Sequence, residues 1–188
     1  MNTSLFSLLL AVGANRAELP PQPALFHDSA RDIDIRSEVT PTEVVFSAEL
    51  PVGWSFRIVV DGDQNGVWGN GPGMDMAKRG ATADHAFSLS RDGSFCAQTI
   101  LASDQNDPGQ ILVSSDCHGY LSKGRIEVGQ QNEQHRVMMA IRVPAEEVFG
   151  KYPDAHLQIC LWDTKTSDCR FSPTRPYILK APSATSAP

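Results

Sequence analysis

The sequence predicts an all-β protein, a jelly-roll-like β-sandwich with one short helix and an N-terminal signal-like segment. Its 188 residues are enough for a single domain. With 41% hydrophobic and 20% charged residues, the chain can form a packed core. Short alternating stretches recur about every 8–12 residues with turn signals between them, as in a sandwich. The 14 glycines and 13 prolines exceed what the interiors of helices tolerate.

The first 14 residues have the features of a signal peptide. Residues 5–14 form a short apolar run, and Val12-Gly13-Ala14 fits the small-residue rule for cleavage after Ala14. No Lys or Arg precedes the run. We therefore expect a secreted or periplasmic protein; the alternative is that the run forms a first strand or helix of the domain. We expect a flexible lead-in over residues 15–32, the β-sandwich domain over 33–180 and a disordered tail over 181–188.

The expected strands follow one another from residue 39 to residue 162. Residues 39–50 alternate around Val44 and Phe46, as a half-buried strand does. Residues 54–60 are β-branched and aromatic, and Asp61-Gly62 ends them. Further strands are expected at residues 74–78, 86–90, 94–101, 111–113, 124–128, 136–143 and 156–162.

One short helix is predicted over residues 144–150. Pro144 stands at its first position, Glu146 and Glu147 place negative charge in the first turn, and Gly150 ends it. This is one or two turns, which is too short for the crossover helix of a parallel sheet.

Four cysteines support export, because an even number in an exported chain indicates disulfides. Cys160 and Cys169 flank a polar segment that reads as a loop between two strands, so a bridge across it is geometrically easy. Cys96 and Cys117 would then form the second pair among three possible connectivities. A metal site is the weaker alternative, because no pair has C-x-x-C spacing.

The charge balance and the lengths of the apolar runs argue against two broad classes of function. The chain has 16 Lys and Arg against 22 Asp and Glu, a net charge of −6, which argues against a general nucleic-acid binder. No apolar run reaches the roughly 18 residues of a membrane-spanning helix. We therefore expect no nucleic-acid partner and no membrane span.

An acidic loop follows the strand expected at residues 54–60. Asp61, Asp63, Asn65 and Gly66 spell D-x-D-x-N-G, and alternate residues of a tight loop can aim their oxygens at a calcium ion. The carbonyl of Val67 could add a ligand. A further carboxylate, Asp75, closes the site if the glycine-rich segment doubles back. The last ligand position of an EF-hand loop is Pro72 here, so the loop is not an EF-hand. The alternative is that Asp-Gly and Asn-Gly form a hairpin turn with solvated carboxylates.

The order of these features resembles the family 9 carbohydrate-binding module and the related DOMON-like sandwiches. The resemblance is carried by IVVDGDQNGVWG, by GPGMDM and by MMAIRVPAEEVFG, and it covers roughly residues 33–180. It implies a jelly-roll-like β-sandwich, bound calcium in some members, and a sugar-binding cleft in the carbohydrate-binding members.

Such modules recognise sugars with exposed aromatic side chains, and three tryptophans are candidates here. Trp68 is the strongest because it lies in the glycine-rich loop, where it need not serve the core. Trp54 opens an apolar strand and Trp162 ends one, so packing in the core is the alternative role for each.

These observations favour an exported, non-enzymatic binding module whose ligand is a glycan or a cell-envelope component, with calcium as a stabilising cofactor. No nucleophile elbow, P-loop, zinc-protease motif or dinucleotide fingerprint is present. The alternative is an exported protein-interaction module, of the inhibitor or immunity type. An aromatic platform near the acidic loop would favour a sugar, and a protruding loop without a cleft would favour a protein.

Overall fold

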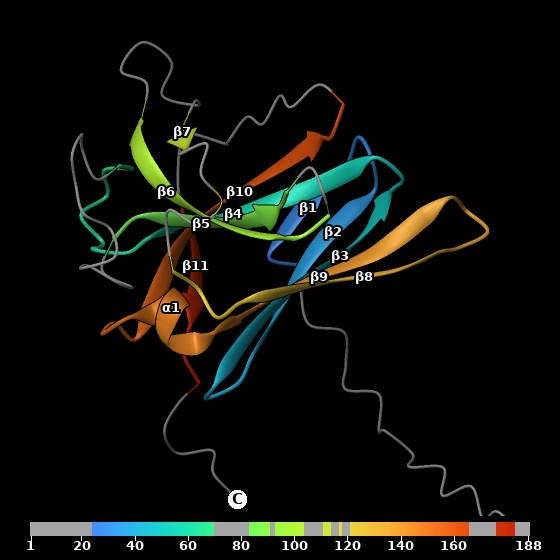
Figure 1. Cartoon of the computed structure of the whole chain (residues 1–188). Helices are drawn as coiled ribbons and strands as arrows, with labels where there is room; N and C mark the ends of the chain where they lie inside the picture. The colour runs from blue at the N-terminus through green and yellow to red at the C-terminus, as the bar shows by residue number, and fades with distance from the viewer. Residues whose placement is uncertain are drawn as a thin grey trace, which may run out of the picture.

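A computed structural model of the chain describes residues 24–69, 83–90, 93–103, 111–113, 117, 121–165 and 176–182. Within these ranges the chain forms two antiparallel sheets packed face to face and one short helix, so the predicted all-β sandwich is confirmed (Figure 1). Sheet A has the strand order β1-β2-β3-β9-β8, and sheet B has the order β11-β10-β4-β5-β6-β7. No helix in the described ranges is long and apolar enough to span a membrane.

The strands of sheet A are β1 (Phe26–Asp28), β2 (Ile33–Val39), β3 (Glu43–Pro51), β8 (Arg125–Gln131) and β9 (Arg136–Pro144). Those of sheet B are β4 (Trp54–Asp61), β5 (His85–Leu89), β6 (Phe95–Ser103), β7 (Ile111–Val113), β10 (Asp154–Asp163) and β11 (Tyr177–Lys180). Three of them, β1, β2 and β11, were not expected as separate strands. β1 lies inside the expected lead-in and pairs with β2, so residues 26–28 belong to the sheet. The strand expected at residues 74–78 lies outside the described residues, as do the signal-like segment 1–14 and most of the tail.

Two connections carry the chain from sheet A to sheet B. They leave the adjacent strands β3 and β9 of sheet A and enter the adjacent strands β4 and β10 of sheet B. One is the turn from β3 to β4, and the other is the helix between β9 and β10. β3 pairs with β9 over its whole length, with Phe46 opposite Ile141, and β4 pairs with β10, with Ile58 opposite Ile159. The four strands form the centre of the sandwich.

The core lies between the sheets and follows the alternation of the strands. In β3 the buried apolar side chains Val44, Phe46 and Leu50 recur at every second or fourth residue, and the polar residues point away. In β4 Phe56 and Ile58 point into the same core. Strand β4 is unusual because most of its other face is buried too: Val59 belongs to a second, smaller hydrophobic cluster of sheet B, against which Trp68 packs.

Helix α1 (Ala145–Phe149) is shorter than expected, and Pro144, expected at its first position, lies at the N-cap position and makes no capping hydrogen bond with its side chain. The side chain of Glu147 is buried and accepts hydrogen bonds from the Ser122 hydroxyl and, at 2.9 Å, from the Lys123 amide. On the sheet B side, Nε2 of the buried His85 lies 2.8 Å from the Glu147 carbonyl oxygen. The helix therefore ties the entry of β8 to the middle of sheet B.

Strand β8 forms the outer edge of sheet A, and nearly all its residues are exposed. Its pairing with β9 shifts in register between Val128 and Gln131. Two arginines and two glutamates of adjacent strands form alternating ion pairs beside this edge, with Arg125 bound to Glu43 at 2.8 Å and Arg142 bound to Glu127 at 2.9 Å.

The predicted disulfide between Cys96 and Cys117 is present. Cys160 is also disulfide-bonded, and Cys169, its predicted partner, lies outside the described residues. The strand expected at residues 156–162 is present within β10, which ends at Asp163, and residues 164 and 165 form a turn after it. A disulfide is compatible with an oxidising compartment.

The sandwich closes tightly around Gly124, just before β8. A methyl group at this position would overlap the ring of Phe95 and lie 2.8 Å from Val143 Cγ1, whereas at Gly129 the nearest atom would be 3.4 Å away. We expect Gly124→Ala to lower the free energy of unfolding by about 1–3 kcal/mol through overpacking. The control Gly129→Ala should change it by less than about 0.5 kcal/mol. Urea unfolding of both variants measures this, and equal stabilities would contradict the packing described here.

Candidate functional site

The candidate residues lie at the two ends of β4. Trp54 begins the strand and Asp61 ends it. At about 3.3 Å per residue the two are about 23 Å apart. A small ligand beside Trp54 therefore does not touch an ion held by Asp61.

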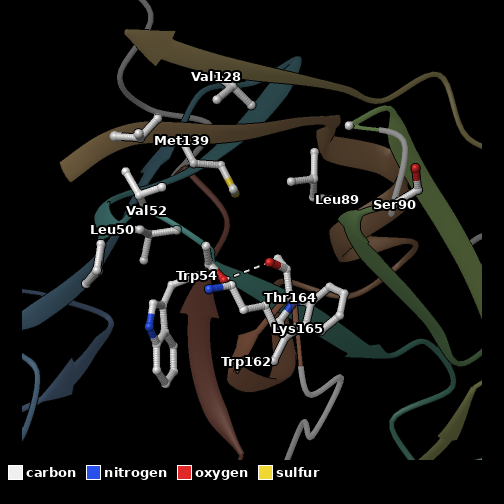
Figure 2. A pocket seen from close by; sticks show the side chains of 14 residues that line it. Leu50, Val52, Trp54, Leu89, Ser90, Val128, Met139, Trp162, Thr164 and Lys165 are labelled. Atoms are coloured by element: carbon white, nitrogen blue, oxygen red, sulfur yellow. Dashed lines mark hydrogen bonds between the residues drawn. The ribbon is translucent and has the colours of Figure 1, made fainter. Parts of the chain in front are cut away.

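A cleft of about 600 Å³ opens at the Trp54 end of the sandwich. Figure 2 shows Val128 and Met139 of sheet A on one side of it and Trp54 and Trp162 of sheet B on the other. Most of the lining is apolar, and the polar side chains among the described lining residues are Ser90, Thr164 and Lys165.

The turn from β3 to β4 forms the rim of this cleft and is held rigidly. Gly53 has φ +87°, a backbone conformation that favours glycine. Its carbonyl oxygen accepts hydrogen bonds from both the amide and the hydroxyl of Thr164, each at 2.8 Å (Figure 2). The end of β10 is thereby fixed to the start of β4, which brings the two tryptophans to one cleft.

Each of these two tryptophans lies beside an arginine. The guanidinium carbon of Arg31 lies 4.5 Å from the ring centre of Trp54, and that of Arg57 lies 5.7 Å from the ring centre of Trp162. Trp162 is 7% exposed, and its indole N–H is buried without a hydrogen-bond partner in the described part of the chain. Trp162 is therefore a buried packing residue that also lines the cleft, whereas Trp54 is only partly buried.

Trp68 does not line this cleft. It is partly buried and packs on the outer face of sheet B, against a cluster that contains Val59, Cys160 and Trp162. Trp162 is common to both places. It lines the cleft together with Trp54, and it belongs to the outer cluster against which Trp68 packs.

At the other end of β4, three carboxylates converge. Oxygen atoms of Asp61, Asp63 and Asp84 all lie within 4.8 Å of one another, and Asp61 and Asp84 are buried. The loop after β4 wraps around them, because Gly66 donates its amide to Asp61 at 3.1 Å and Gly69 donates to Asp84 at 2.7 Å. Sequence reasoning missed Asp84 as a ligand. The available signal was its position just before β5, since the start of an antiparallel strand lies beside the end of its neighbour.

The other residues expected to bind calcium occupy different places. Asn65 closes a local turn, with its side-chain oxygen accepting from the Val67 amide at 2.6 Å and its side-chain nitrogen donating to Asp63 at 2.8 Å. Val67 is exposed, and Asp75 lies outside the described residues. The loop thus has the geometry of a turn while it also brings carboxylates together.

Burial and neighbouring charges raise the pKa values of Asp61 and Asp84. Burial, with the nearby charge of Asp63, raises the pKa of Asp61. Burial and the charges of Asp61 and Asp63 raise the pKa of Asp84 to about 6, against the hydrogen bonds from Gly69 and Gly62 that lower it. Asp61 Oδ1 is buried and has no hydrogen-bond partner in the described ranges. Three crowded carboxylates with an unused oxygen match the oxygen ligands that Ca²⁺ prefers.

The raised pKa values give the cation-free protein a defined pH dependence. A carboxyl whose pKa is higher in the folded state holds its proton more tightly there, so stability falls as pH rises through that pKa. With chelator present, we expect the melting temperature to fall between about pH 4 and about pH 7, across the range in which Asp84 ionises. Asp84→Asn should flatten this slope whatever its absolute stability. Thermal melts across the range measure it, and an unchanged slope in the variant would contradict the assignment.

Comparisons of the chain with protein-family models, with curated proteins and with solved structures found no match. The similarity to the family 9 carbohydrate-binding module therefore stays a prediction from the sequence motifs.

Proposed function

We propose that the chain is an exported, non-enzymatic binding module that holds a glycan, free or as part of a cell-envelope component, in the cleft beside Trp54 and Trp162. The observation that carries this proposal is the position of the two tryptophans on one side of a cleft of about 600 Å³. Clefts that hold small ligands have volumes of about 300–1,000 Å³ and combine apolar walls with a few polar groups.

The chemistry of the lining suits a sugar ring. A sugar presents C–H groups on its faces and hydroxyls around its rim, so it packs on aromatic rings and hydrogen-bonds sideways. Lys165 offers donors, and the Thr164 hydroxyl, whose proton is used by Gly53, offers an acceptor.

A binding role, in place of catalysis, is supported by what the cleft contains. Its described lining residues include no histidine, cysteine or carboxylate that would serve as a base or nucleophile. The disulfide between Cys96 and Cys117 is compatible with export to an oxidising compartment.

Calcium enters this proposal as a stabilising ion at Asp61, Asp63 and Asp84. The support is the convergence of three carboxylates and the unpartnered oxygen of Asp61. Since this cluster lies at the far end of β4 from the cleft, the ion would fix the loop after β4 and would not contact the ligand.

A protein partner is the second candidate, and one observation favours it. Val52 and Val128, which line the cleft, are each more than half exposed. Exposed apolar side chains gathered at one end of a molecule are typical of protein interaction sites.

The glycan proposal is tested by a glycan array followed by calorimetry on the sugars that bind. Trp54→Ala should weaken binding about tenfold or more, which corresponds to about 1.4 kcal/mol. Ile178→Ala, which removes an exposed apolar side chain of β11 outside the cleft, is the control and should retain the affinity. An array without binders, or equal affinities of the two variants, would overturn the glycan proposal.

Binding of a purified protein that is lost in Val128→Asp would establish the alternative.

The calcium proposal is tested by thermal melts with calcium and with chelator. At free calcium about 100 times the dissociation constant, stability should rise by roughly 2.7 kcal/mol. Asp63→Asn should remove most of this increase, because it withdraws one of the three charges. Glu133→Gln, which removes an exposed charge from the β8–β9 turn, should retain it. A melting temperature insensitive to millimolar calcium would refute the proposal.

A further inference from the structure

The face of sheet B that points away from the core carries a group of polar side chains at its centre. Arg57 lies opposite Ser88 of β5 on one side and opposite Cys160 of β10 on the other. Gln158 and Trp162 lie two residues before and after Cys160, so they point to the same face. We call Arg57, Ser88, Gln158 and Trp162 the Arg57 cluster.

Each member of the Arg57 cluster has a buried hydrogen-bonding atom without a partner in the described part of the chain. These atoms are Arg57 Nε, Ser88 Oγ, Gln158 Oε1 and Trp162 Nε1. Ser88 is 1% exposed, Gln158 is 3% exposed and Trp162 is 7% exposed. Because buried polar atoms in native proteins are almost always hydrogen-bonded, four unpartnered atoms on one sheet face indicate a missing partner.

The charge of Arg57 indicates what that partner is. Its described contact is the ring of Trp162 at 5.7 Å, and no carboxylate in the described ranges pairs with it. Burial lowers the pKa of Arg57 to about 10, so the guanidinium still carries its charge at neutral pH. By contrast, four other arginines each pair with a carboxylate: Arg31, Arg36, Arg125 and Arg142.

Water satisfies only part of this requirement. Ordered waters can hydrogen-bond to Ser88, Gln158 and the Trp162 indole. They leave the guanidinium of Arg57, which is partly buried and has a buried Nε, without an opposite charge, and an anion beside a partly buried cation stabilises it. An oxyanion fulfils both needs, since its oxygens accept from a guanidinium and from an indole N–H together.

We propose that the outer face of sheet B is a binding site for an oxyanion, a carboxylate or sulfate group, held by Arg57 and the indole N–H of Trp162. The Ser88 hydroxyl donates a further hydrogen bond, and the Gln158 side-chain oxygen accepts from a hydroxyl next to the anionic group. This pattern of donors around one acceptor is complementary to an acidic sugar, which carries a carboxylate or a sulfate ester beside free hydroxyls.

The site adjoins the proposed glycan cleft through Trp162, which lines both. The charged side chain among the described lining residues of that cleft is the cation Lys165. That the anion belongs to a sugar rests on the proposed function, whereas the oxyanion site rests on the Arg57 cluster alone.

The oxyanion site is tested first with inorganic sulfate. Sodium sulfate, titrated against sodium chloride at constant ionic strength, should shift the NMR signal of the Arg57 Nε–H in a saturable way. The indole N–H signal of Trp162 should shift in the same titration. Arg57→Gln should abolish this indole shift, and Arg57→Lys should retain part of it. Arg36→Gln on sheet A is the matched control and should leave it unchanged. Absence of a saturable shift in the native protein would overturn the site.

The sugar is tested with an oligogalacturonate, a sulfated oligosaccharide and a neutral oligosaccharide of equal length. An acidic sugar should bind about tenfold or more tightly than the neutral one, and Arg57→Gln should remove this preference while Trp54→Ala weakens all three. A sulfate shift without sugar binding supports the oxyanion site and overturns its assignment to a glycan. Equal binding of acidic and neutral sugars by the native protein overturns the preference while leaving the glycan proposal intact.

Discussion

Strand β4 is buried on both faces, and the arrangement of every candidate site follows from that. Its inward face carries Phe56 and Ile58 into the core, and its outward face carries the partly buried Arg57 and Val59, which belongs to a second cluster. Because the strand is fixed between β10 and β5, its two ends and its outer face are positioned by sheet hydrogen bonds and not by flexible loops. Trp54, Arg57 and Asp61, one residue from each of the three candidate sites, are therefore all positioned by this one strand.

The local sequence pattern was enough to predict the sandwich, but it predicted only part of the candidate sites. The alternation around Val44 and Phe46, and the abrupt stop at Asp61-Gly62, are properties of short segments, and both strands are present. Asp84 was missed as a carboxylate ligand because it joins Asp61 only through the pairing of β4 with β5, across 23 residues of chain. Arg57 reads as an ordinary outward residue, since nothing in its neighbours shows that the outer face is covered. β1 was missed because three residues carry too little alternation to be recognised.

The loop after β4 links the acidic end of the strand to its outer face. It follows Asp61, contains Asp63 and continues to Trp68, which packs against the cluster that contains Trp162. An ion that neutralised the carboxylates would hold the backbone amides of this loop in place, and Trp68 with them. The same few residues thus connect the electrostatics of the acidic cluster to the packing around the Arg57 cluster, although the two lie at different positions along β4.

The exposed edge of sheet A has a consequence for the behaviour of many copies of the protein at high concentration. An edge strand offers unpaired backbone groups to which another chain can add. In β8 the register shift between Val128 and Gln131 interrupts that row, and the ion pairs of Arg125 and Arg142 place fixed charges beside it. An incoming strand would meet a kinked template and would have to strip water from charged side chains. The β8 edge of sheet A is therefore a poor template for the addition of a further strand.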